Sequence, residues 1–153
     1  MIVRVFDGVA KHFPARRSEW MGAVMMFGWG RFVANDGDLF DKAVAYQHMA
    51  RMADEATWAY WATAIGLIRL AALLINGSFH DRWYSKYSPH VRGVMSFFAC
   101  FLWCQLSLGL FGSGTLPPAL AIYPVLAVND LLNVFSAARD AGKSVKAAAN
   151  EPN

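Results

Sequence analysis

The chain has 153 residues, of which 56% are hydrophobic and 16% are charged, and its formal net charge is +3. Soluble domains contain about 45–50% apolar and about 25% charged residues, so this composition favours a membrane protein over a soluble one. A positive net charge can accompany nucleic-acid binding, but the basic residues are scattered among apolar segments and form no cluster. We therefore expect no nucleic-acid partner.

The first candidate span covers residues 18–34. Residues 1–19 carry four basic and two acidic groups, so we expect no cleavable signal peptide there. The apolar part of the span is short and contains Arg31. It can cross a membrane only if basic side chains at its start extend to the headgroups. Three glycines in this segment would let another helix approach closely: Gly22, Gly28 and Gly30.

Residues 34–56 are too polar to cross a membrane, because they carry two basic and five acidic groups. Asp38 suits the N-cap of a helix. Four small or apolar residues then recur at helical spacing, namely Ala45, Met49, Met52 and Ala56. This pattern predicts a short amphipathic helix that lies on the membrane surface. A solvated loop is the alternative interpretation.

Three further apolar segments predict spans at residues 57–76, 94–112 and 117–138. The first has 20 residues, which at ~1.5 Å each cover the ~30 Å hydrocarbon core. Trp58, Tyr60 and Trp61 at its start suggest an aromatic belt at the membrane interface. We therefore predict an all-α protein, a four-helix integral membrane bundle within a single domain of residues 1–142. A polar C-terminal tail, residues 143–153, follows it.

The distribution of basic residues predicts the topology. The segments outside the spans carry four, two, three, none and three basic residues in chain order. Because cytoplasmic segments are enriched in lysine and arginine, we expect both termini and residues 77–93 in the cytoplasm. Residues 34–56 then face the periplasm.

Arg69 interrupts the apolar run AIGLIRLAALLING. In the predicted topology the spans at residues 57–76 and 117–138 are entered from the same side, and Arg69 and Asp130 are each the thirteenth residue counted from Thr57 and from Pro118. An unpaired charge near a helix centre costs about 2.5–3.5 kcal/mol, so we predict an ion pair between them. Its role is either to fix the packing of the helices or to form a polar path or proton relay. Further polar groups at this depth are Asn129, Asn133 and Gln105.

No catalytic motif or phosphate-binding loop is present, so we expect neither an enzyme nor a cofactor. His80, Asp81 and His90 have ligand chemistry but no recognised metal-site spacing, and we interpret them as solvated loop residues. Cys100 and Cys104 are four residues apart on one helix face, and we expect them to be packing residues.

Four segments carry a family resemblance: SEWMGAVMMFGWG, WATAIGLIRLAALLING, SPHVRGVMSFFACFLW and YPVLAVNDLLNVFSAARDAG. Together, over residues 18–142, they resemble a loosely defined group of small four-span membrane proteins of tailed bacteriophages. The resemblance implies an effector in the host inner membrane, either holin-like or an exclusion or ejection factor. An accessory subunit of a larger membrane complex is the second hypothesis, and a minimal transporter or membrane enzyme is the third. The expected partners are the lipid bilayer and either further copies of the chain or a larger complex.

Overall fold

The computed structural model describes residues 13–78, 87–114 and 117–149. Over these residues the chain forms helices and turns, with no strand. Four long helices account for most of it, and three short helical turns connect the first two. In chain order the elements are η1 (Pro14–Arg16), α2 (Arg17–Asn35), α3 (Leu39–Lys42), η2 (Val44–Tyr46), α4 (Gln47–Ala50), α5 (Glu55–Ser78), α6 (Ser88–Gly112) and α7 (Ala119–Ala149).

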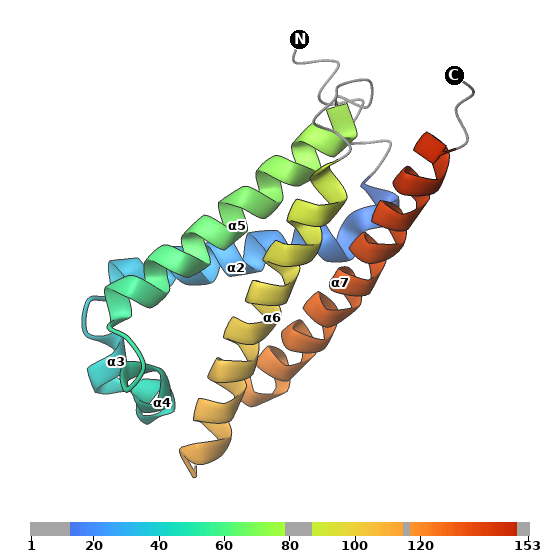
Figure 1. The fold of residues 1–153 in the computed structure, drawn as a ribbon. Coiled ribbons are helices and arrows are strands. Elements are labelled where there is room, and N and C mark those ends of the chain that lie inside the picture. Colours follow the sequence, from blue (N-terminus) through green and yellow to red (C-terminus); the bar gives the residue numbers. More distant parts are fainter. Residues whose placement is uncertain (1–12, 79–86, 115–116, 150–153) are drawn as a thin grey trace.

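The four long helices alternate in direction, as Figure 1 shows. The start of α2, the end of α5, the start of α6 and the end of α7 lie at one end of the bundle, which we call the terminal end. The connection through α3 and α4 and the turn between α6 and α7 lie at the opposite end. Helix α2 packs mainly on α5, and α6 packs mainly on α7.

Three of these helices are long and apolar enough to cross a membrane: α5 over Glu55–Ile75, α6 over Ser88–Gly112 and α7 over Ala119–Lys143. Helix α2 is a continuous helix of 19 residues but is not among them. The charges of Arg17, Glu19 and Arg31 offset its apolar residues. Helix α7 also continues to Ala149, so the segment from residue 143 that was expected to be a tail begins as helix.

Local signals explain where the helices begin. The Asp54 carboxylate accepts a hydrogen bond from the Thr57 backbone amide at 2.8 Å, which satisfies a free amide in the first turn of α5. Pro89 lies in the first turn of α6, where a missing amide hydrogen costs nothing. Gly114, with φ of +67°, follows the end of α6 and allows the chain to turn towards α7.

The prediction of one amphipathic helix between α2 and α5 is wrong. Ala43 has an extended backbone and separates α3 from η2, so residues 39–50 form single turns. Of the predicted apolar face, Met49 is buried, whereas Met52 is 53% exposed. Phe40, which that face did not include, is buried. The Glu55 carboxylate accepts a hydrogen bond from the Phe40 amide at 3.1 Å and so ties the turns to α5.

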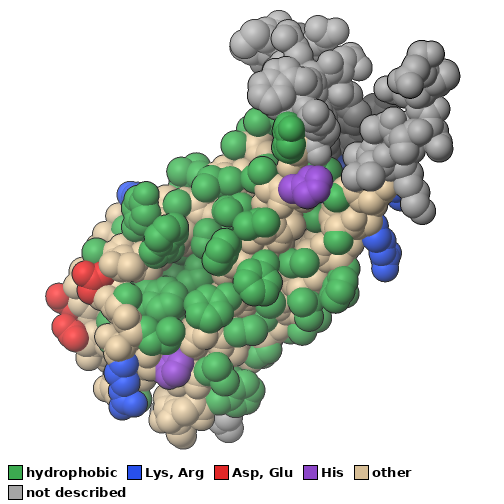
Figure 2. Space-filling model, in the orientation of Figure 1, with side chains coloured by type: hydrophobic (Ala, Val, Ile, Leu, Met, Phe, Trp, Pro, Cys, Tyr) green, Lys and Arg blue, Asp and Glu red, His purple; other side chains and the backbone are tan. Residues whose placement is uncertain are grey.

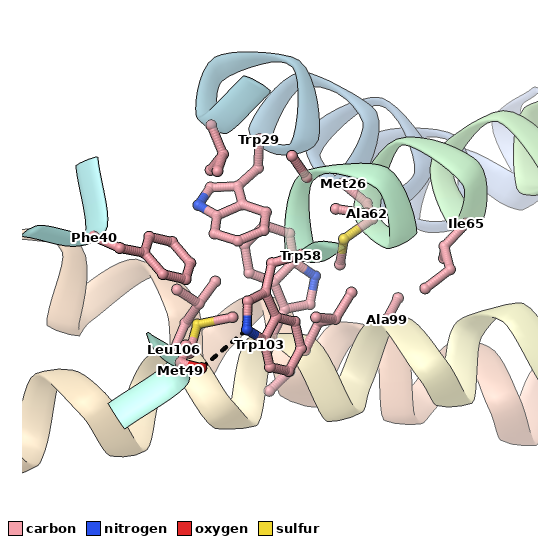
Figure 3. Packing of buried hydrophobic residues seen from close by; sticks show 14 residues of the cluster. Met26, Trp29, Phe40, Met49, Trp58, Ala62, Ile65, Ala99, Trp103 and Leu106 are labelled. Carbon is pink, nitrogen blue, oxygen red and sulfur yellow. Dashed lines mark hydrogen bonds between the residues drawn. The ribbon is translucent and has the colours of Figure 1, made fainter. Parts of the chain in front are cut away.

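An aromatic and methionine core fills the half of the bundle near α3 and α4, as Figure 3 shows. The rings of Trp29 and Trp103 meet edge to face with centroids 6.3 Å apart. Trp58 donates from its indole Nε1 to the Met49 carbonyl at 3.1 Å. Trp58 is therefore buried rather than part of an interfacial belt, whereas Tyr60 and Trp61 beside it are exposed.

Helices α2 and α5 approach closely enough for their backbones to touch. A Cβ placed on Gly30 would lie 2.6 Å from the Thr63 backbone nitrogen, and one on Gly66 would lie 2.6 Å from that of Phe27. Any side chain there would force the helices apart. Gly30 thus has the packing role expected from the sequence. Gly28 does not, because a Cβ there would meet nothing within 4 Å.

Candidate functional site

The structure brings Arg69 and Asp130 together. Arg69 on α5 donates from Nη2 to Asp130 Oδ1 on α7 at 2.5 Å. Arg69 is 1% exposed and Asp130 is fully buried. Both charges are thus removed from the surroundings and compensate each other inside the bundle.

Asp130 accepts hydrogen bonds from two further side chains, one on α6 and one on α7. Trp103 on α6 donates from Nε1 to Asp130 Oδ2 at 3.1 Å. Asn133, one turn along α7, donates from Nδ2 to Asp130 Oδ1 at 3.1 Å. The side-chain Oδ1 of Asn133 accepts a hydrogen bond from the Ser18 hydroxyl on α2 at 2.9 Å. The carboxylate is therefore held by one cation and two neutral donors, which is the satisfaction that a buried charge requires.

Helix α2 passes directly beside this pair at Gly22. A Cβ on Gly22 would lie 2.8 Å from Asp130 Oδ1 and 2.9 Å from Arg69 Nη2. The half-buried Asn129 also lies here and donates to the Ser18 carbonyl at 3.3 Å. Gly22 therefore leaves the space in which the ion pair forms, a more specific role than the helix packing predicted for it.

A second group of charges lies towards the terminal end. Arg92 on α6 donates from Nε and Nη2 to the two oxygens of Glu19 on α2, both at 2.6 Å. Arg92 Nη2 also lies 3.2 Å from Asp140 Oδ2 on α7, and Arg16 donates to the same oxygen at 3.2 Å. The two-point contact between guanidinium and carboxylate fixes the orientation of both groups. Arg92 is 1% exposed, so its charge is enclosed within the bundle.

The two groups together form a polar network that is electrically neutral. Three arginines, Arg16, Arg69 and Arg92, face three carboxylates, Glu19, Asp130 and Asp140. Each of the four long helices contributes at least one of the hydrogen-bonding side chains. The bundle therefore has an apolar aromatic half and a polar half, with the Arg69 and Asp130 pair at their boundary.

Other residues singled out in the sequence lie elsewhere. Gln105 on α6 is not part of the network, because its Oε1 lies 3.0 Å from His48 Nε2 on α4. Cys100 is half-buried against the core, but Cys104 is exposed, so only the first can pack inside the chain.

The network could bind charge or fix the helices, and a metal site would need suitable ligands among the described residues. They include no group of three histidine, cysteine, aspartate or glutamate side chains that could hold a metal ion. His90 is exposed on α6, while His80 and Asp81 lie outside the described residues. Arginine does not release its proton in proteins, so the three cations can hold carboxylates but cannot pass protons between them.

Sequence reasoning missed Ser18, Glu19, Trp103 and Asp140 as members of the network. A weak signal existed on α7, because Asp130, Asn133 and Asp140 follow one another at intervals of three and seven residues and share a helix face. The partner of Arg92 had no such signal, since Glu19 lies 73 residues away on α2. Trp103 carries no charge, and only the packing of α6 on α7 reveals its role.

Comparison of the chain with protein-family models, with curated proteins and with solved structures gives no match. The functional argument therefore depends on the geometry of this network and on the surfaces around it.

Proposed function

We propose that the chain is a small multi-pass protein of a bacterial inner membrane that acts as one intact four-helix unit, as a phage-encoded effector of the exclusion or ejection type. The observation that carries this proposal is the neutral network, which joins α2, α5, α6 and α7 through buried ion pairs. A protein held in one defined arrangement is suited to bind another membrane component. The resemblance to small phage membrane proteins supports the biological setting.

The network argues against a holin-like lesion as the main activity. A lesion former rearranges its helices when it assembles, and rearrangement here would separate Arg69 from Asp130 and Arg92 from Glu19. Removing one partner of a buried pair costs roughly 3–5 kcal/mol. Two such pairs would therefore oppose dispersal of the helices.

A transporter has less support. None of the grooves described for this part of the chain, with volumes of about 160–480 Å³, is lined by Arg69, Asp130 or Glu19. Transport or proton relay needs a route from solvent to the charged groups. Arg69, Asp130, Glu19 and Arg92 are instead buried, and only Arg16 and Asp140 at the terminal end are partly exposed.

An accessory subunit of a larger membrane complex is the second candidate, and α7 is the observation that favours it. Only 17% of the apolar window of α7 is buried, against 44% for α5 and for α6. Its outward face presents large apolar side chains, including Val125, Leu132 and Phe135. A helix with so little intramolecular contact is available to pack on another membrane protein.

Inducible expression in a bacterial host tests these candidates, with growth, membrane potential and infection by superinfecting phage as the readouts. We expect normal growth and potential together with reduced infection. The Asp130→Leu variant should lose this protection because the bundle is disrupted, and Gly28→Ala should keep it. Abrupt depolarisation and death would contradict the proposal and favour a lesion former. Normal infection would contradict it in favour of the accessory subunit.

A further inference from the structure

An apolar groove of about 400 Å³ lies between α5 and α6, and we call it the α5–α6 groove. Figure 2 shows hydrophobic side chains covering this face of the molecule, with a hollow among them. Trp58, Trp61 and Ile68 line the groove from α5, and Phe98 and Phe101 line it from α6. Both helices are long and apolar enough to cross a membrane, so the groove opens towards lipid.

A second, smaller hollow of about 160 Å³ lies next to it at the end of α6, and we call it the polar pocket. Gln47, His48 and Arg51 line it on one side, and Gly109 and Ser113 line it on the other. No acidic side chain is among its lining residues. The pocket thus offers the cation of Arg51 and the side-chain amide of Gln47 near the end of α6, which suits a phosphate group. The Ser113 hydroxyl already donates to the Leu110 carbonyl at 2.7 Å.

The two hollows follow each other along the molecule. Arg51 lines the polar pocket, and the next residue, Met52, lines the α5–α6 groove. On α6 the groove residue Phe101 and the pocket residue Leu108 lie on the same face, with Gln105 between them. One elongated amphipathic molecule can therefore occupy both.

Hydrogen bonds hold the segment between the hollows in place. Trp58 donates to the Met49 carbonyl at 3.1 Å, which fixes α4 against α5. His48 Nε2 lies 3.0 Å from Gln105 Oε1, which fixes α4 against α6. Gly109 allows α6 to touch the Ala45 carbonyl. The shape of both hollows is thus formed before any ligand binds, and this lowers the entropic cost of binding.

We propose that the protein binds one phospholipid, with an acyl chain in the α5–α6 groove and the phosphate in the polar pocket beside Arg51. Along α5 the groove extends from Thr57 to Ile68, which at about 1.5 Å per residue is roughly 16 Å. This is about half of the ~30 Å hydrocarbon core and matches the chain of a lipid in one leaflet. That leaflet is the one on the side of residues 36–54. The inference depends on membrane insertion but not on the biological role proposed above.

A partner helix fits the groove less well than an acyl chain. A helix about 10 Å across and 16 Å long occupies roughly 1,200 Å³, about three times the groove volume of about 400 Å³. A helix would also leave the cation of Arg51 without an anion. The combination of an apolar groove with a cationic pocket at its end matches a phospholipid, which has both an acyl chain and an anionic phosphate.

Native mass spectrometry of the full chain, purified in detergent and titrated with phosphatidylglycerol, tests the proposal. We expect one lipid to bind more tightly than any further lipid. Arg51→Gln, which removes the charge, should weaken this binding by about tenfold or more, as the loss of a charge-assisted hydrogen bond does. Ile68→Trp, which narrows the groove, should weaken it as well.

Two matched variants control for charge and bulk. Lys42→Gln removes a cation from the same segment, but Lys42 pairs with Asp36 at 3.1 Å and does not line the pocket, so affinity should not change. Leu67→Trp adds the same bulk one residue earlier on α5, in a different groove. Far-UV circular dichroism shows whether each variant remains folded.

Three results would overturn the proposal. Equal affinity of the wild type, Arg51→Gln and Ile68→Trp would show that the lipid binds elsewhere. Displacement of the lipid by glycerophosphoglycerol at equal concentration would show that the headgroup alone is recognised. Equal binding of diacylglycerol, which lacks phosphate, would show that the polar pocket is not used.

Discussion

Gly22 lies directly beside the ion pair of Arg69, with the Arg69 Nη2 atom 2.9 Å from where a Cβ on Gly22 would be. Asp130 Oδ1 would be 2.8 Å from the same Cβ. Arg69 Nη2 donates a hydrogen bond to Asp130 Oδ1, which also accepts one from Asn133, so neither atom can move away without loss of a hydrogen bond. One absent methyl group on α2 therefore permits the contact between α5 and α7.

We predict that Gly22→Ala destabilises the protein by about 1–3 kcal/mol, the usual cost of overpacking. Gly28→Ala is the matched control in the same helix, because a Cβ there meets nothing within 4 Å. It should leave stability unchanged or raise it by up to about 1 kcal/mol. Unfolding by sodium dodecyl sulfate from detergent micelles measures both. Equal stability of the two variants would show that α2 does not approach the ion pair.

Asp130→Leu should destabilise the bundle more than Arg69→Leu. Loss of Asp130 leaves the charge of Arg69 buried and removes the acceptor of Trp103 and Asn133, whereas loss of Arg69 leaves Asp130 with both of these donors. Each single change should cost roughly 3–5 kcal/mol. The double variant should be more stable than the sum of the two single effects by about 1 kcal/mol or more. Strict additivity in this double-mutant cycle would exclude a direct interaction.

The two-point contact between Arg92 and Glu19 predicts that lysine cannot replace Arg92. Lysine keeps the charge but cannot donate in parallel to both carboxylate oxygens. Arg92→Lys should therefore lower the free energy of unfolding by about 1–3 kcal/mol. Arg139→Lys, at an exposed position of α7, serves as the control and should have no effect. A stable Arg92→Lys protein would mean that charge alone matters at this position.

The Asp54 cap predicts a dependence of stability on pH. The hydrogen bonds from the side chain and then the backbone of Thr57 hold the pKa of Asp54 below its ordinary value. A lowered pKa in the folded state stabilises the protein above the unfolded pKa, and this contribution disappears as the pH falls through the folded value. The difference in melting temperature between wild type and Asp54→Ala should thus shrink from pH 7 towards pH 3. Asn caps a helix without titrating, so the difference in melting temperature between Asp54→Asn and Asp54→Ala should stay constant from pH 7 to pH 3.

Cysteine labelling tests the topology. In a protein with Cys100 and Cys104 replaced by alanine, a membrane-impermeant maleimide should modify Asp36→Cys and Ser113→Cys in intact cells with a permeable outer membrane. Lys143→Cys, at the opposite end of the bundle (Figure 1), should react only after the inner membrane is opened, and so should Ser85→Cys, which lies outside the described residues. Labelling of Lys143→Cys but not of Asp36→Cys in intact cells would show that the topology is the reverse of the predicted one. Equal labelling of Asp36→Cys and Lys143→Cys would contradict the three spans α5, α6 and α7 between them. Helix α2 is tested by Phe13→Cys, which precedes it: labelling of this cysteine in intact cells would remove α2 as a span.

The long helices and one contact between them follow from the pattern of apolar and charged residues. In lipid, backbone amide and carbonyl groups must form hydrogen bonds within the protein, so an apolar run of span length forms a helix. Helices α5, α6 and α7 lie where these runs predict. The pairing of Arg69 with Asp130 was also predictable, because depth in a span follows from residue count and each charge needs a partner.

Which other residues join Arg69 and Asp130 depends on how the helices pack. The contact between Glu19 and Arg92 depends on the axial positions of α2 and α6, and that of Trp103 with Asp130 depends on how α6 faces α7. Likewise, Gly22 and Gly30 approach neighbouring helices while Gly28 faces outwards. In a helix, residues about 100° apart in rotation face different neighbours, and the sequence does not say which neighbour lies on each side. Residues 39–50 differ from the predicted helix for a related reason. Phe40 and Met49 are both buried against the bundle, and separate turns rather than one continuous helix place them there.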